Sequence, residues 1–236
     1  FVLLLVLFHA GAMHRRDFRL DLAGVGFYPL VLFGAVCLGV VLSYAPGLSF
    51  RFLLYHLSAA LCVLVTVSAV RSLSDLKRLA AGGAVCVAVS GVYGIIQRIQ
   101  GVEVSSSTVD LKVNAGMPGR VVSIFDNANT FAEVLLLLLP LVLALILCSK
   151  RTTSKVLAAI VFLVGGIALG MTYSRATWVG FVCAMAVFVF LWKPRLIPAF
   201  LVLCCLAVPF LPATIWNRIL TIFNPADSST ASRIPL

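Results

Sequence analysis

One arginine, Arg175, lies in a short polar segment between two long apolar runs, 156–171 and 179–191. Two membrane helices joined by so short a turn form a hairpin, which holds the guanidinium group at a membrane surface. A guanidinium group carries a permanent charge and a planar fork of N–H donors, which suits bidentate binding of phosphate oxygens. Alternatively, Arg175 anchors the hairpin at the lipid headgroups, with Tyr173 and Trp178 as interfacial aromatic residues. The sequence leaves both interpretations open.

A second polar group occurs where another long apolar run begins. Its members are spaced i, i+3, i+4 and i+7 and so share one face of a helix: Asp126, Asn129, Thr130 and Glu133. Glu133 lies about one turn inside the apolar run, where a carboxylate is costly unless it is paired or hydrated. Thr130 and Glu133 also fit a capping box, which is a structural role. The N-terminus of a helix is, in addition, a natural binding site for phosphate.

Three more arginines lie in polar segments on the same predicted membrane face as the hairpin turn. They are Arg120 in the loop 98–127, and Arg218 and Arg233 in the segment 213–236. Taken singly, each of these arginines is also typical of an ordinary solvated loop without a binding role. A cluster of guanidinium groups beside amide and carboxylate side chains, however, suits the binding of phosphate. The pattern therefore predicts a membrane protein that binds an anionic, lipid-borne ligand at this face.

The elements that position these residues are predicted to be membrane-spanning helices. Hydrophobic residues make up 62% of the 236-residue chain, which excludes an ordinary soluble domain. Several apolar runs reach about 18 residues, enough to cross a hydrocarbon core of roughly 30 Å, where a helix satisfies the backbone groups. We predict an all-α, polytopic integral membrane protein with about eight transmembrane helices in a single domain over 1–236. The predicted spans are 1–13, 22–45, 52–70, 79–96, 128–148, 156–171, 179–191 and 196–212.

The orientation of these spans follows from the distribution of lysine and arginine. Basic residues are dense in the short loops after the first, third, fifth and seventh spans and sparse in the others. Since basic loops favour the cytoplasm, the other loops are predicted to be exterior. The exterior segments are then the loop 98–127, the hairpin turn, and 213–236, which is the start of a large exterior loop. The chain begins without methionine and ends in polar sequence, so we expect a fragment at both ends with the first helix truncated.

Charge and cysteine content exclude other classes of protein. The net charge is +10, but the basic residues form short clusters at helix ends, so no nucleic acid partner is expected. The seven cysteines lie in or beside apolar spans and form no Cys-x-x-Cys pair, so no metal site and no cofactor are expected. Two pairs of small residues spaced i, i+4 predict close helix packing: Gly166 with Gly170, and Ala84 with Ala88.

The chain resembles the O-antigen ligase family, which includes related O-antigen polymerases. The resemblance rests on three blocks in the family's order: 119–140, with Gly119-Arg120-Val121, Phe125-Asp126-Asn127-Ala128-Asn129 and Pro140; 172–180, with Ser174-Arg175; and 218–234, with Arg218, Asp227-Ser228-Ser229 and Ser232-Arg233-Ile234. These blocks cover the second half of the chain. The first half resembles the family in hydropathy alone.

The resemblance implies a membrane glycosyltransferase of the bacterial inner membrane with an exterior active face. Such an enzyme transfers a glycan from a polyprenyl diphosphate carrier to a hydroxyl group of a lipid or glycan acceptor, among membrane lipids and without a cofactor. By matching position, Arg175 and Arg233 are the expected catalytic residues, which hold the diphosphate and stabilise its leaving charge. The expected substrate-binding residues are Arg120, Asn129, Glu133 and Arg218.

The sequence departs from the family at two places. The family's general base is a histidine late in the large exterior loop, and no histidine here lies in a matching position: His9, His14 and His56. The block 126–129 lacks the family's usual proline. We therefore expect truncation before the histidine and no activity from this chain by itself. The alternatives are a transporter of a small anionic solute, which would place charged or broken helices near mid-membrane, and a non-catalytic membrane subunit.

Overall fold

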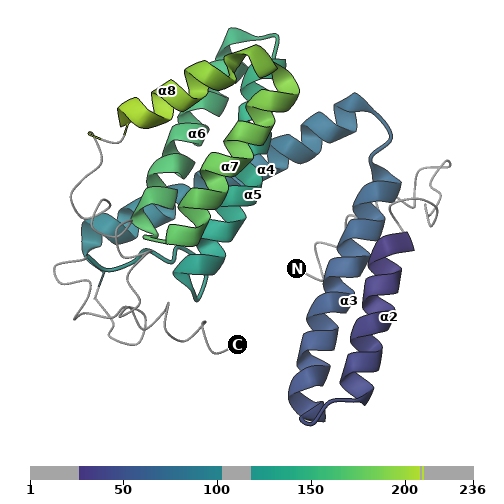
Figure 1. Ribbon diagram of the computed structural model, residues 1–236. Coiled ribbons are helices and arrows are strands. Elements are labelled where there is room, and N and C mark those ends of the chain that lie inside the picture. The colour runs from purple at the N-terminus through teal and green to yellow at the C-terminus, as the bar shows by residue number, and fades with distance from the viewer. Residues whose placement is uncertain (1–26, 103–117, 208, 210–236) are drawn as a thin grey trace. The chain divides into compact units, whose positions relative to one another are not determined.

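The computed structural model describes residues 27–102, 118–207 and 209 (Figure 1). The described residues form helices and no strand, in the order α2 Phe27–Val41, α3 Pro46–Ala69, α4 Leu73–Gln100, α5 Ala128–Cys148, α6 Thr152–Met171, α7 Arg175–Trp192, η2 Pro194–Leu196 and α8 Ile197–Ala207. Within these ranges five helices, α3 to α7, are long and apolar enough to cross a membrane. The predicted all-α, polytopic membrane fold is confirmed. The first predicted span, 1–13, and the segment 213–236 lie outside the described residues.

Four helices, α3, α4, α6 and α7, begin earlier than the hydropathy predicts, because the helical backbone continues into the polar sequence before each apolar run. α3 begins at Pro46, since proline is favoured in the first turn of a helix, where its missing N–H is not needed. α4 begins at Leu73, where the hydroxyl of Ser72 accepts a hydrogen bond from the Asp75 N–H at 3.2 Å. α7 begins at Arg175 itself, so the arginine is the first residue of the helix.

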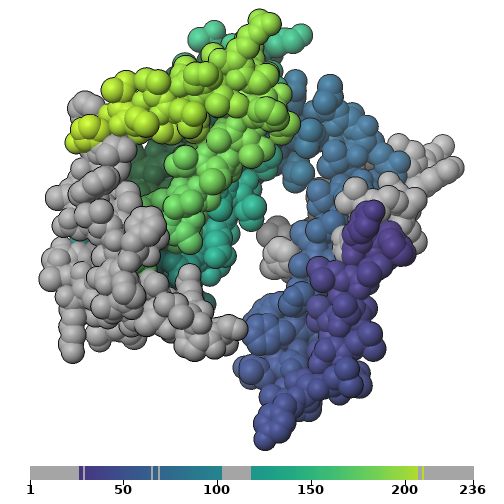
Figure 2. Space-filling view, in the orientation of Figure 1, coloured from purple at the N-terminus to yellow at the C-terminus, as the bar shows by residue number. Residues whose placement is uncertain are grey.

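The chain divides into two compact units, Phe1–Arg78 and Leu79–Leu236. In the first unit, α2 and α3 pack against each other as a helical hairpin. In the second unit, α5 packs against both α6 and α7, and α8 follows α7 through the short helix η2. Figure 2 shows α7 and α8 at the surface of this second unit.

The core of the second unit is centred on one face of α5. Its fully buried side chains follow the helical period: Phe131, Leu135, Leu139 and Val142. Other faces of the same helices carry exposed large apolar side chains, such as Leu137 on α5 and Leu163 on α6, both more than half exposed. Lipid chains are as apolar as leucine, so helix association rests on close packing rather than on the exclusion of water. Apolar side chains therefore cover both the inside and the outside of this unit.

A glycine sets the closest approach of the helices in this core. A Cβ atom on Gly165 of α6 would lie 2.5 Å from Val87 Cγ1 of α4 and 2.8 Å from Leu139 Cδ2 of α5. The prediction that Gly166 and Gly170 provide this packing is wrong, because a Cβ atom on either would meet nothing within 4 Å. Neighbouring positions on a helix differ by about 100° in direction, so the adjacent residue of the Gly-Gly pair faces the core instead.

Candidate functional site

One end of the second unit brings together two segments that are far apart in the sequence. The loop that precedes α5 runs along the turn between α6 and α7, where the Val121 N–H donates to the Met171 carbonyl at 3.4 Å. Arg120 strengthens this contact, because its Nε donates to the Thr172 carbonyl at 2.7 Å. The α6–α7 turn and the residues 118–127 thus form one structure, which we call the arginine end after Arg120 and Arg175.

The guanidinium group of Arg120 is held in place from two sides. Besides the Thr172 carbonyl, it donates through Nη2 to the side-chain oxygen of Asn129, in the first turn of α5. Both acceptors are neutral, so no carboxylate among the described residues neutralises its charge. Burial, and then the positive charge of Arg175, lower the pKa of Arg120 below its usual value. The positive charge of Arg175 thus acts on Arg120, and two positive charges that repel each other favour an anion between or beside them.

The α6–α7 turn is fixed by hydrogen bonds inside it. Trp178 donates from its indole N–H to the Leu169 carbonyl at 3.1 Å, and the Ser174 and Thr177 hydroxyl groups lie 2.8 Å apart. Tyr173 occupies the left-handed region with a φ of +51°, which is a strained conformation for a residue with a side chain. The turn therefore fixes the start of α7 firmly. Arg175 lies at this helix N-terminus, where unpaired N–H groups and the helix dipole add positive potential.

A second contact fixes the loop that precedes α5 to α4. Its residues were not among those predicted from the sequence. Gln97 donates from Nε2 to the Ser123 carbonyl at 2.9 Å and accepts from the Ser123 N–H at 2.8 Å. The buried Ser123 hydroxyl donates to the Ser90 carbonyl at 2.6 Å, and Ser123 has a φ of +56°. The signal that could have identified this contact is Gln97, an amide side chain at the end of the apolar part of α4.

The prediction that Thr130 and Glu133 form a capping box is wrong. α5 begins at Ala128, and the capping residue is Asn127, whose side-chain oxygen accepts from the Asn129 N–H at 2.7 Å. Asn127 lies three residues before Thr130, so its cap starts the helix earlier and places Thr130 inside the first turn. Glu133 is exposed in the second turn of α5, and it forms no ion pair with any residue in the described ranges. A capping role therefore does not explain this carboxylate.

We expect Glu133→Gln to leave the amount of protein in the membrane unchanged, because its carboxylate has no ion-pair partner in the described part of the chain, and to lower the glycan transfer that the resemblance implies, if the carboxylate positions an arginine or the substrate. The comparison is Asn127→Ala, which removes the observed cap and should reduce stability by about 1 kcal/mol. Thermal unfolding in detergent and transfer in cells should be measured for both variants. Unchanged transfer by Glu133→Gln would show that this carboxylate has no part in the reaction.

The other predicted site residues fall into two groups. Asn129 and Glu133 both lie in the first two turns of α5, at the arginine end. Arg218 and Arg233 lie outside the described residues, so their predicted places at this site stay predictions. Within the described ranges, no group of three His, Cys, Asp or Glu side chains could hold a metal ion. No family model, curated protein or solved structure matches this chain.

The two ends of α6 provide a test of orientation, because the helix begins at Thr152 and ends at Met171 in the arginine end. We expect the arginine end to be exterior, since Lys150, Arg151 and Lys155 lie in the loop and first turn at the opposite end of α6. Single cysteines at Ser107 and Thr153 in a cysteine-free version should be treated with an impermeant maleimide in intact cells. Labelling at 107 alone is the expected result, and labelling at 153 alone would reverse the orientation.

Proposed function

We propose that this protein transfers a glycan from a polyprenyl diphosphate carrier to an acceptor hydroxyl group at the exterior face of the bacterial inner membrane, as the O-antigen ligases and polymerases that it resembles do. The observation that carries the proposal is the pair of guanidinium groups of Arg120 and Arg175. Neutral groups, the Thr172 carbonyl and the Asn129 side chain, hold Arg120, and the positive charge of Arg175 acts on it at the same end of a helical membrane protein. A diphosphate at the membrane surface has the charge and the geometry that such a pair binds.

In the proposed reaction the acceptor oxygen attacks the anomeric carbon of the glycan. The bond between that carbon and the diphosphate oxygen breaks, and the electron pair leaves with the diphosphate. The acceptor proton passes to a general base, for which the resemblance implies a histidine. Arg175 stabilises the negative charge that develops on the leaving group, and donors placed in this way are worth about 2.7–4 kcal/mol each in other enzymes. Arg120 and Asn129 hold the loop in which the diphosphate is bound.

The position of the charges supports surface chemistry over transport. The charged residues of α4 to α7 lie within two turns of a helix end, and those helices continue without a break through the middle of the span. A transporter would instead place charged groups or interrupted helices near mid-membrane. The apolar interior of α5, α6 and α7 offers no such groups to a small anion.

Transfer by the protein expressed from its complete gene tests this proposal. The protein should be reconstituted in liposomes with a polyprenyl diphosphate-linked oligosaccharide and a lipid-linked acceptor, and the product measured by mass spectrometry. The expected result is an acceptor that gains the oligosaccharide with release of polyprenyl diphosphate. Uptake of a soluble anion into the same liposomes, without any transfer, would favour the transporter instead.

A further inference from the structure

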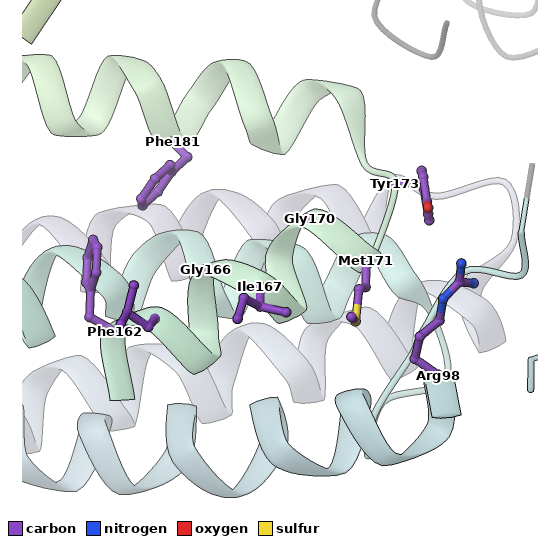
Figure 3. A pocket seen from close by; sticks show the side chains of 9 residues that line it. Arg98, Phe162, Gly166, Ile167, Gly170, Met171, Tyr173 and Phe181 are labelled. Carbon is purple, nitrogen blue, oxygen red and sulfur yellow. The ribbon is translucent and has the colours of Figure 1, made fainter. Parts of the chain in front are cut away.

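An apolar groove runs along α6 beside the arginine end. It has a volume of about 540 Å³, which lies in the range of pockets for small ligands. Arg98 and Tyr173 lie at one end of the groove, and Phe162 and Phe181 lie at the other (Figure 3). All of its lining residues belong to the second unit, on α4, α6, α7 and the turn between α6 and α7.

The floor of the groove is hollow because it lacks side chains. Phe162, Gly166 and Gly170 recur every fourth residue along one face of α6, a distance of about 12 Å. A Cβ atom on Gly166 or Gly170 would meet nothing within 4 Å, so the space above both glycines is open. The open space along this face of α6 leaves room for a hydrocarbon chain to lie along the helix.

The two ends of the groove differ in chemistry. At the inner end, the rings of Phe162 and Phe181 lie 6.3 Å apart, in the middle of the helical span. At the outer end, the Arg98 guanidinium lies 6.0 Å from the centre of the Tyr173 ring and donates from Nη1 to the Gly119 carbonyl at 3.1 Å. A guanidinium group has five N–H donors, and among the described residues the Gly119 carbonyl accepts from one of them, so the group can also donate to a ligand. The groove thus matches a chain that has an anionic group at one end.

We propose that this groove binds the isoprenoid chain of the polyprenyl diphosphate, with Arg98 at its first phosphate. The choice of this lipid rests on the proposed function. Arg98 contacts Gly119, the neighbour of Arg120, and lies against Tyr173, two residues before Arg175, so the groove opens at the arginine end. The chain would then lie within the hydrocarbon region and the diphosphate at its surface. Met171, also in the lining, supplies a flexible contact for a branched chain.

Photocrosslinking tests the groove without any transfer reaction. The protein expressed from its complete gene is placed in lipid nanodiscs with geranylgeranyl diphosphate that carries a diazirine at its tail. We expect crosslinks on α6 and α7, and we expect Gly166→Leu and Gly170→Leu to lower the yield by about tenfold or more, because leucine fills the groove. The matched control is Gly82→Leu on α4, where an added side chain also meets nothing within 4 Å. Unchanged crosslinking by both groove variants would overturn the proposal.

Competition with unlabelled lipids identifies the occupant and does not depend on any variant. Decaprenyl diphosphate should abolish the crosslinks, whereas dioleoylphosphatidylglycerol and decaprenol should compete much less. Equal competition by the phospholipid would make the groove a general lipid site, and equal competition by the alcohol would exclude the role of Arg98. Either result would overturn the proposal. The crosslinking experiment contains no acceptor, so its result does not depend on glycan transfer. A failed crosslinking experiment would overturn the groove alone, and a failed transfer assay would overturn the proposed function alone.

Discussion

We expect Arg175→Lys to lower glycan transfer by about 10²–10³-fold, the loss seen when a donor to a developing negative charge is removed from other enzymes. Lysine keeps the charge but presents a compact ammonium group instead of a planar fork, so it cannot bind two phosphate oxygens side by side. Arg175 is the first residue of α7, on a turn fixed by the Trp178–Leu169 hydrogen bond. Its side chain therefore starts from a fixed point, and the shorter lysine side chain would place its single ammonium group short of the guanidinium position.

The experiment separates a phosphate-binding arginine from a membrane anchor. An anchor at the headgroups needs a positive charge alone, so an anchor role predicts normal transfer by the lysine variant. Transfer in cells should be compared among Arg175→Lys, Arg175→Ala and the control Arg195→Lys, with membrane levels followed by blotting. Arg195 lies in η2 after α7, away from the arginine end, and its substitution should have no effect. Transfer by Arg175→Lys at the parent level would make Arg175 an anchor.

Arg120→Gln is expected to have the second large effect, on both stability and transfer. The substitution removes the hydrogen bond to the Thr172 carbonyl and the one to Asn129, which together join the loop to the α6–α7 turn and to α5. Hydrogen bonds that involve a charged group contribute about 1.5–3 kcal/mol each. The loss leaves the partly buried Thr172 carbonyl without this donor, and the position of Arg175 becomes less defined. The melting temperature should fall and transfer should be almost abolished.

Asn129→Ala provides the graded comparison for this effect. It removes one partner of Arg120 but keeps the bond to the Thr172 carbonyl, so its effects on both quantities should be smaller. Arg120→Lys should recover part of the stability through a single hydrogen bond but little of the transfer, because it lacks the fork. The melting temperature in detergent and transfer in liposomes should be measured for all three variants. A melting temperature and a transfer rate at the parent level in Arg120→Gln would contradict the role of Arg120.

Much of the helical architecture could be predicted from hydropathy and helix-terminal residues. The bounds of α5 were predicted from the apolar run that begins after Asn127, and the hairpin of α6 and α7 from the shortness of its turn. The start of α7 was placed too late, at 179 instead of Arg175, since hydropathy alone starts a membrane helix after the polar residues of the turn. Helical backbone geometry continues past the apolar run wherever local capping allows it.

The contacts of the site were less predictable, because they join backbone groups that carry no sequence signal. The acceptor for Arg120 is the carbonyl of Thr172, and any residue at that position would offer the same oxygen. The choice between Gly165 and Gly166 as the packing glycine depends on the rotation of α6, which a small-residue pattern does not define. In contrast, the alternation of loops rich and poor in lysine and arginine did predict that three residues lie at the same end of the helices: Arg120, Asn129 and Arg175.

The affinity for the diphosphate group is the most direct measure of what the arginine end does. Binding of decaprenyl diphosphate and decaprenol should be measured in nanodiscs for the parent protein and for the double variant Arg120→Gln/Arg175→Gln. We expect the parent to bind the diphosphate about 10²-fold more tightly than the alcohol, because charge-assisted hydrogen bonds to phosphate are strong. The double variant should lose most of this preference and keep only the part that Arg98 contributes. Equal binding of the two lipids by the parent, or an unchanged preference in the double variant, would contradict a diphosphate site at Arg120 and Arg175.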